Sequence, residues 1–195
     1  MPTGVAIRDP RGQLFDAAGR VLLRAGPAAL TSRSVTAEAG VAKGVLHRHF
    51  ADFDAFLTEW ARDQLARSGA EADALRAAAG AGTVHGNLAA ALPGLFSPAA
   101  LALTRLVIAR DELRARLRQA SGSRLPPLSE ITAGIAGYLA AERDLGRVAA
   151  AADIPALAPA LAGAAHLLFT DAEPGRPDTA AVTAMVRAVL AGAAP

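Results

Sequence analysis

Cysteine is absent from this sequence, and its absence excludes disulfide bonds and thiolate metal sites. Aromatic residues make up only 4% of the chain, whereas 52% of it is hydrophobic, with alanine and leucine dominant. This composition favours close-packed helices over a sheet built from β-branched and aromatic side chains. The 195 residues are enough for a sizeable all-α core, and we expect a reducing, cytoplasmic location.

Long uninterrupted apolar runs are also missing. The most apolar stretch, residues 148–169, contains Asp153, Pro155, Pro159 and His166, whereas spanning a bilayer takes about 20 consecutive apolar residues. We therefore expect a buried helix there and no membrane contact. The first 19 residues have no apolar core and carry several charges, so we expect no secretory signal.

Lysine occurs once, at Lys43, so nearly every base is arginine. The sequence pI near 9.9 therefore overstates a net charge of only +2. The first 67 residues contain nine bases and seven acids and carry this entire excess. The excess is modest for a nucleic-acid-binding protein, but two copies in a dimer would double the local field.

Residues 30–56 predict two short helices that meet at a glycine turn. Thr31 can cap the first helix, Gly40 can take a positive φ, and the second helix begins near Ala42. On the second helix Leu46 and Phe50 face inward, which leaves the basic residues outward. This arrangement is typical of a helix-turn-helix that enters a DNA major groove.

The remaining helices are predicted from apolar periodicity and caps. A first helix is expected over residues 10–25, stopped by Gly26-Pro27, and a connector helix capped by Asp52 over residues 53–67. Further helices are expected over 71–79 and 83–92 (one broken helix or two), 97–119, 128–143, 153–169 and 178–190, with loops at 122–127 and 173–177.

The order and spacing of these residues resembles the tetracycline-repressor-like (TetR) family of transcriptional regulators. The resemblance covers about residues 10–57. It rests on an apolar helix ending at Gly26, then Leu30-Thr31-Ser32-Arg33, Val35, Ala39-Gly40-Val41, Gly44, Leu46, His49-Phe50 and Phe56-Leu57. It implies a regulator that binds double-stranded DNA, forms a homodimer through its last two helices, and takes a small, mostly apolar effector without any cofactor.

The resemblance also implies a domain division. Residues 1–9 are expected to form a disordered arm, residues 10–52 the DNA-binding domain, and residues 53–195 the ligand-binding and dimerisation domain. The residues expected to contact DNA are Thr31, Ser32, Arg33, Lys43, Gly44, Val45, His47, Arg48 and His49. The hydroxyls of Thr31 and Ser32 suit phosphate at a helix start, and Arg33 suits phosphate or a base edge. Lys43, Gly44 and Val45 suit base edges.

Three positions depart from the family pattern. His47 stands where a phosphate-binding tyrosine is usual, Phe53 where a lysine is usual, and Thr36 where a small apolar residue is usual. These departures leave an alternative open: a small-molecule-binding protein of the same fold whose head reads DNA only weakly. If the chain is a DNA-binding regulator, exchanging Phe53 for lysine is expected to raise its DNA affinity.

Polar and aromatic residues of the body are candidates for an effector pocket between helices. They are Trp60, His85, Phe96, Thr104, Tyr138, His166 and Phe169. Core packing is the alternative for each, because apolar residues at helical spacing usually pack. His85 and His166 have no neighbouring ligand in the sequence, so we expect no metal site.

Catalytic patterns are not found. The sequence has no phosphate-binding glycine loop and no nucleophile elbow, so we expect no enzyme and assign no catalytic residue. Five arginines between residues 105 and 118 surround Asp111 and Glu112, and we expect ion pairs along a solvated helix face.

Overall fold

The structure, a computed structural model, describes residues 9–123, 125–172 and 176–193. Within these residues the chain is all-α, which confirms the predicted fold class. Its helices are α1 (Pro10–Ala29), α2 (Ser32–Glu38), α3 (Gly44–His49), α4 (Phe53–Ala77), α5 (Val84–Leu95), α6 (Pro98–Ala109), α7 (Asp111–Ser121), α8 (Pro126–Asp144), α9 (Ile154–Asp171) and α10 (Thr179–Val189). The expected arm lies outside the described residues except for Asp9, which caps α1.

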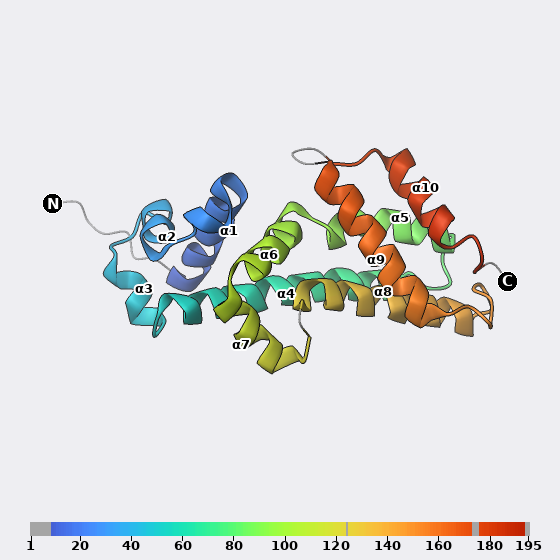
Figure 1. Cartoon of the computed structure of the whole chain (residues 1–195), viewed down its shortest axis with the longest axis horizontal. Helices are drawn as coiled ribbons and strands as arrows, with labels where there is room; N and C mark the ends of the chain where they lie inside the picture. The colour runs from blue at the N-terminus through green and yellow to red at the C-terminus, as the bar shows by residue number, and fades with distance from the viewer. Residues whose placement is uncertain (1–8, 124, 173–175, 194–195) are drawn as a thin grey trace.

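Helix α4 forms the long axis of the molecule (Figure 1). The three head helices α1–α3 lie at its beginning, and α8 packs along its second half. Helices α9 and α10 lie beyond α8 and α5, at the end away from the head, while α6 and α7 lie beside the middle of α4. The whole is a small head joined by one continuous helix to a helical body.

Two apolar cores follow one another along this axis. The first joins α1–α3 to the beginning of α4 and to α6 and α7, and contains Trp60 and Leu106. The second joins the end of α4 to α5, α8, α9 and α10, and contains Leu75 and Leu101. Helices α4 and α6 contribute to both cores, so they connect the head mechanically to the body.

The prediction that α4 ends near Arg67 and that a separate helix covers residues 71–79 is wrong. The helix continues through Gly69 to Ala77 because its second half packs closely on α8. At the contact, a Cβ added to Gly134 would lie 2.5 Å from the Cβ of Ala72. This tertiary packing overrides the local helix-breaking tendency of glycine.

The prediction of a single helix over residues 97–119 is also wrong, because the helix is interrupted at Arg110. Arg110 takes an extended conformation, φ −126° and ψ 101°, between α6 and α7. Its guanidinium donates to the carbonyl of Leu30 at 2.6 Å and to that of Pro27 at 3.4 Å. These long-range contacts hold the break against the linker between α1 and α2, which no local pattern reveals.

The predicted caps and turns are confirmed elsewhere. Thr31, Asp52, Ser97, Asp153 and Asp178 each accept a hydrogen bond from the first turn of their helix. The predicted stop at Gly26-Pro27 is a kink inside α1, where Gly26 has φ 74°. Of the loop expected over residues 173–177, residues 173–175 lie outside the described part of the chain.

Helix α9 is the one described helix that is long and apolar enough to cross a membrane by itself, and the pair α5 and α6, bent by 60°, meets the same criterion together. One third of α9 is buried inside the chain, against α8 and α10. A core helix of a non-membrane protein meets this criterion as well, so length and composition leave the expected absence of membrane contact a prediction.

Candidate DNA interface and effector pockets

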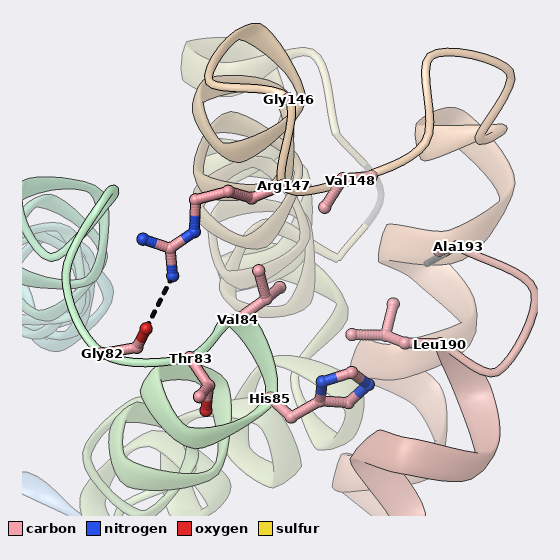
Figure 2. Close-up of a pocket in the computed structure, with 9 residues that line it drawn as sticks. All are labelled: Gly82, Thr83, Val84, His85, Gly146, Arg147, Val148, Leu190 and Ala193. Atoms are coloured by element: carbon pink, nitrogen blue, oxygen red, sulfur yellow. Dashed lines mark hydrogen bonds between the residues drawn. The ribbon is translucent and has the colours of Figure 1, made fainter. Parts of the chain in front are cut away.

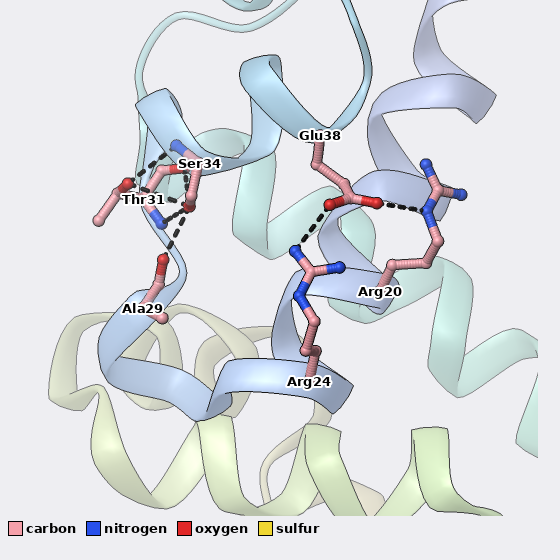
Figure 3. Close-up of polar contacts among 6 residues, drawn as sticks. All are labelled: Arg20, Arg24, Ala29, Thr31, Ser34 and Glu38. Carbon is pink, nitrogen blue, oxygen red and sulfur yellow. Dashed lines mark hydrogen bonds and ion pairs between the residues drawn. The ribbon is translucent and has the colours of Figure 1, made fainter.

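The start of α2 is held by a reciprocal pair of hydrogen bonds. Thr31 Oγ1 accepts from the Ser34 N–H at 3.1 Å, and Ser34 Oγ accepts from the Thr31 N–H at 2.9 Å (Figure 3). The Ser34 hydroxyl also donates to the Ala29 carbonyl at 2.7 Å. This capping box fixes the angle at which the chain enters α2.

The three residues predicted to meet DNA at this helix start face different ways. Thr31 and Arg33 are exposed, whereas Ser32 Oγ is buried and makes no hydrogen bond among the described residues. Thr36 is buried and donates to the Ser32 carbonyl at 2.9 Å, so its hydroxyl is satisfied inside α2. Ser32 therefore has to change rotamer before it can contact a phosphate.

The turn between α2 and α3 has the predicted geometry. Gly40 has φ 66°, in the left-handed region that favours glycine. The N–H of Val41 donates to the Thr36 carbonyl at 3.0 Å and closes the turn, while the Val41 side chain packs partly against the head core. The positive φ of Gly40 lets the backbone change direction sharply, so that α3 points away from α2.

Helix α3 presents a basic outer surface. Lys43, His47, Arg48 and His49 are exposed, and Leu46 is fully buried on the opposite side. Among the described residues, no ion pair occupies Arg33, Lys43 or Arg48, so their charges face solvent. The nine residues predicted to contact DNA thus lie on α2, α3 and the turn that joins them.

Two details refine this surface. Val45 is only half-exposed and packs partly against the head core, so little of it is open to a base edge. Arg33 and Lys43 line one shallow hollow together with Thr36, Ala37 and Val41. Two basic residues separated by ten positions in the sequence are therefore brought together beside α3.

The end of α2 is tied to α1 by a double ion pair. Glu38 accepts from Arg24 at 2.7 Å and from Arg20 at 2.8 Å (Figure 3). The hydrogen bonds from Arg24 and Arg20 lower the pKa of the Glu38 carboxyl below its ordinary value. This contact fixes the orientation of α2, and with it that of α3.

Phe53, one of the departures from the family pattern, packs rather than facing solvent fully. Its ring stacks on Phe56 with centroids 5.6 Å apart, and the guanidinium of Arg110 lies 5.7 Å from its centroid. Phe53 therefore joins the start of α4 to the α6–α7 break. This packing role accounts for an aromatic residue at this position.

The residues predicted to bind an effector do not form one site. Trp60 is buried in the first core, where its indole N–H donates to the Phe15 carbonyl at 3.1 Å. Thr104 is buried and donates to the Ala100 carbonyl at 3.0 Å. Both polar groups are already satisfied by the backbone.

Phe96, His166 and Phe169 do come together. Phe96 stacks on Phe169 with centroids 5.7 Å apart, and the His166 ring lies 6.3 Å from Phe96. His166 Nδ1 is buried and makes no hydrogen bond among the described residues. Burial, with the charge of Arg105, lowers the pKa of His166 below its ordinary value and so favours the neutral imidazole.

Tyr138 belongs to a buried polar network at the far end of the body. Its hydroxyl donates to Glu142 Oε1 at 2.6 Å and accepts from the Asn87 amide at 3.0 Å. Burial and the Glu142 carboxylate raise the pKa of Tyr138 above its ordinary value. Glu142 is fully buried and pairs with Arg147 Nε at 3.0 Å, a role that the sequence did not reveal at this helix end.

His85 lies apart from the other predicted residues, in what we call the distal pocket. This cavity of about 350 Å³ lies between the start of α5, the turn between α8 and α9, and the end of α10 (Figure 2). It is lined by Gly82, Thr83, Val84, His85, Gly146, Arg147, Val148, Leu190 and Ala193. Arg147 was not predicted as a pocket residue because it follows a helix end. The available signal was the four-residue spacing of Tyr138 and Glu142, which places both polar side chains on one helix face near Arg147.

No group of three or more metal-binding side chains lies together in the described part of the chain. Two of the ion pairs expected along the arginine-rich segment are present: Arg116 Nε lies 2.9 Å from Glu112, and Arg114 pairs with Asp111. Arg110 contacts backbone carbonyls instead, as described above, and Arg118 makes no ion pair among the described residues.

A capped helix-turn-helix with a basic outer surface on an all-α body is typical of DNA-binding transcriptional regulators. Residues 14–59 match the family of bacterial regulatory proteins named tetR. This match covers most of the predicted head, and the predicted resemblance is confirmed over these residues. No curated protein matches the chain.

Solved structures with the same fold cover nearly the whole chain. A transcriptional regulator from Rhodococcus sp. RHA1 is 20% identical with a TM-score of 0.72 over 94% of this chain and 97% of that one. The fatty acid degradation regulator FadR from Bacillus halodurans is 17% identical with a TM-score of 0.73, over 96% and 98%. The multidrug binding protein EbrR, complexed with imidazole, is 22% identical with a TM-score of 0.60, over 97% and 96%. At these identities the similarity establishes the fold.

Proposed function

We propose that this protein is a cytoplasmic, ligand-responsive repressor that acts as a homodimer on a palindromic operator. Each copy places α3 in a major groove, and the two-fold axis of the dimer sets the spacing of the half-sites. A small, mostly apolar effector binds the body and favours a separation of the heads that no longer fits the operator. Because this coupling is reciprocal, operator DNA weakens effector binding by the same factor.

The observation that carries the proposal is the outer surface of α3. Its exposed Lys43 and Arg48 have no ion-pair partner among the described residues, while Leu46 anchors the helix in the head core. A basic helix fixed on one side and unpaired on the other is suited to phosphate and base contacts.

The outer face of α9 supports the homodimer. Leu167 is 65% exposed, and the exposed residues that share its face are small: Ala156, Ala160 and Gly163. On the neighbouring α10, Ala180, Ala184 and Ala188 are exposed at four-residue spacing. Apolar helix faces with such small residues pack closely on a second copy, and water is a poor environment for them.

Binding of an effector is supported by the cavities of the body and by the solved relatives. EbrR is described as a multidrug binding protein and was solved with imidazole, and FadR as a regulator of fatty acid degradation. The present chain offers the distal pocket and the partly buried His166 beside Phe96.

The test is fluorescence anisotropy of the purified protein against labelled DNA from immediately upstream of its own gene. A scrambled duplex and a series of salt concentrations accompany it. Binding that resists the scrambled competitor supports the repressor. Weak, sequence-independent and strongly salt-dependent binding to every duplex supports instead the alternative, a small-molecule-binding protein with a degenerate head.

A further inference from the structure

The distal pocket combines an apolar floor with polar groups on one side. Val148, Leu190 and Ala193 are each at least 95% buried and form the floor (Figure 2). His85 is half-buried, its ring reaches toward Leu190, and it makes no hydrogen bond among the described residues. A pocket with an apolar floor and polar groups along one side suits a molecule with an aliphatic tail and one polar head.

Arg147 is the charged group of the pocket. One of its present partners is a carboxylate and two are neutral backbone carbonyls. Its Nη2 donates to the carbonyls of Gly82 at 2.9 Å and Ala81 at 3.1 Å, and its Nε lies 3.0 Å from the buried Glu142 carboxylate. Nη1 has no partner within the described residues. A carboxylate binds a guanidinium more strongly than a neutral carbonyl does, so an acid entering the pocket competes for Arg147.

We propose that the distal pocket binds a small aliphatic carboxylic acid of about five to eight carbon atoms. Its carboxylate contacts Arg147 and His85, and its tail lies against Val148 and Leu190. The volume of about 350 Å³ is sufficient for such a molecule.

The position of the pocket links it to the head through α4. Ala81 and Gly82 belong to the turn that follows α4, and the Asn87 amide donates to the carbonyls of Ala78 at 3.0 Å and Ala81 at 2.9 Å. An acid that takes Arg147 from this turn releases one end of α4. A helix of 25 residues is about 37 Å long, and its other end directly follows the recognition helix α3. This consequence for DNA rests on the proposed function, whereas binding of the acid does not.

The experiment is calorimetric titration of hexanoate into the full-length protein in the absence of DNA. Hexanamide has the same tail without the charge, and acetate has the charge without the tail. We expect one saturable hexanoate site per chain and at least tenfold weaker binding of both controls. Ala193→Phe fills the cavity and His85→Phe removes the polar edge, and each is expected to weaken hexanoate at least tenfold. Unfolding midpoints followed by circular dichroism, which reports on the helices of both cores, establish that the variants are folded.

Three results overturn the inference: no saturable hexanoate binding, equal binding of hexanamide, or unchanged binding by folded Ala193→Phe. Addition of hexanoate to the DNA complex then separates this site from the proposed function. Binding of hexanoate without release of DNA retains the pocket and overturns its regulatory role. Release of DNA by another small molecule, in a protein that does not bind hexanoate, retains the repressor and overturns the pocket.

Discussion

Arg48 is the residue whose loss best tests contact between α3 and DNA. It is exposed in the last turn of α3 and has no ion-pair partner among the described residues. We expect Arg48→Ala to weaken operator binding about tenfold and to reduce the salt slope by about one, because one phosphate or base contact is lost. Anisotropy at several salt concentrations measures both effects.

The matched control removes the same charge elsewhere. Arg118 is an exposed arginine in the last turn of α7, outside the helix-turn-helix. Arg118→Ala is expected to leave affinity and salt slope nearly unchanged. Equal losses in the two variants would mean that Arg48 contributes only to the overall field, against the docking proposed for α3.

Glu38 makes the stability of the folded head depend on pH. Because Arg24 and Arg20 lower its pKa below the ordinary value of 4.5, the carboxylate stabilises the folded state above that pH. The stabilisation disappears as the pH falls through the lowered pKa. We therefore expect Glu38→Gln to lower the urea midpoint at pH 7 and to match the wild type near the acid end of the titration.

Asp73 provides the comparison for this pH series. Its side chain is 77% exposed and lies 3.9 Å from Arg76, a surface pair that contributes little. Asp73→Asn is expected to follow the wild type across the whole range. If the difference between Glu38→Gln and wild type stays constant with pH, the ion pairs with α1 are not its source.

At the scale of elements, the contact between α4 and α8 depends on a glycine opposite an alanine. A methyl group on Gly134 would lie 2.5 Å from the Cβ of Ala72, so Gly134→Ala is expected to cost about 1–3 kcal/mol of unfolding free energy. The exchanged pair Ala72→Gly with Gly134→Ala moves the methyl group across the interface. It should therefore be more stable than the sum of the single changes predicts. Urea unfolding of all four proteins measures the coupling.

Gly19 tests whether the effect comes from packing. It lies inside α1, and nothing comes within 4 Å of a Cβ added there. Gly19→Ala should gain about 0.5–1 kcal/mol from helix propensity alone. A similar gain from Gly134→Ala would show that α4 and α8 can separate without cost.

The elements that sequence patterns predict well are those with local causes. The caps of α2, α4, α6, α9 and α10 and the turn at Gly40 follow from single residues and their near neighbours. The extension of α4 past Gly69 and the break at Arg110 come from contacts between residues far apart in the chain. The candidate sites differ in the same way. The outward residues of α3 follow from local helix periodicity, whereas Arg147 and the distal pocket depend on how three chain segments meet.

At the scale of the whole molecule, Arg110 connects the body to the head. It bonds to the Leu30 carbonyl at 2.6 Å and lies over the Phe53 ring. Arg110→Ala leaves that carbonyl unpaired, and we expect a loss of about 1–2 kcal/mol in unfolding followed by Trp60 fluorescence. Arg67→Ala, which removes an exposed pair with Asp63, should cost under about 0.5 kcal/mol. Equal effects would show that the α6–α7 break does not support the head.

The dimer is the largest unit on which the proposed repressor depends, and Leu167 is placed to test it. Its side chain is 65% exposed on α9, so Leu167→Glu places a charge at the proposed contact without disturbing the core. We expect the variant to be a monomer by light scattering and to lose at least tenfold in operator affinity, because one head then binds one half-site. Leu23→Glu makes the same change at a leucine that is 50% exposed on α1, and it should stay dimeric. A dimeric Leu167→Glu would place the contact elsewhere, and an unchanged affinity in a monomer would mean that a single head suffices to recognise DNA.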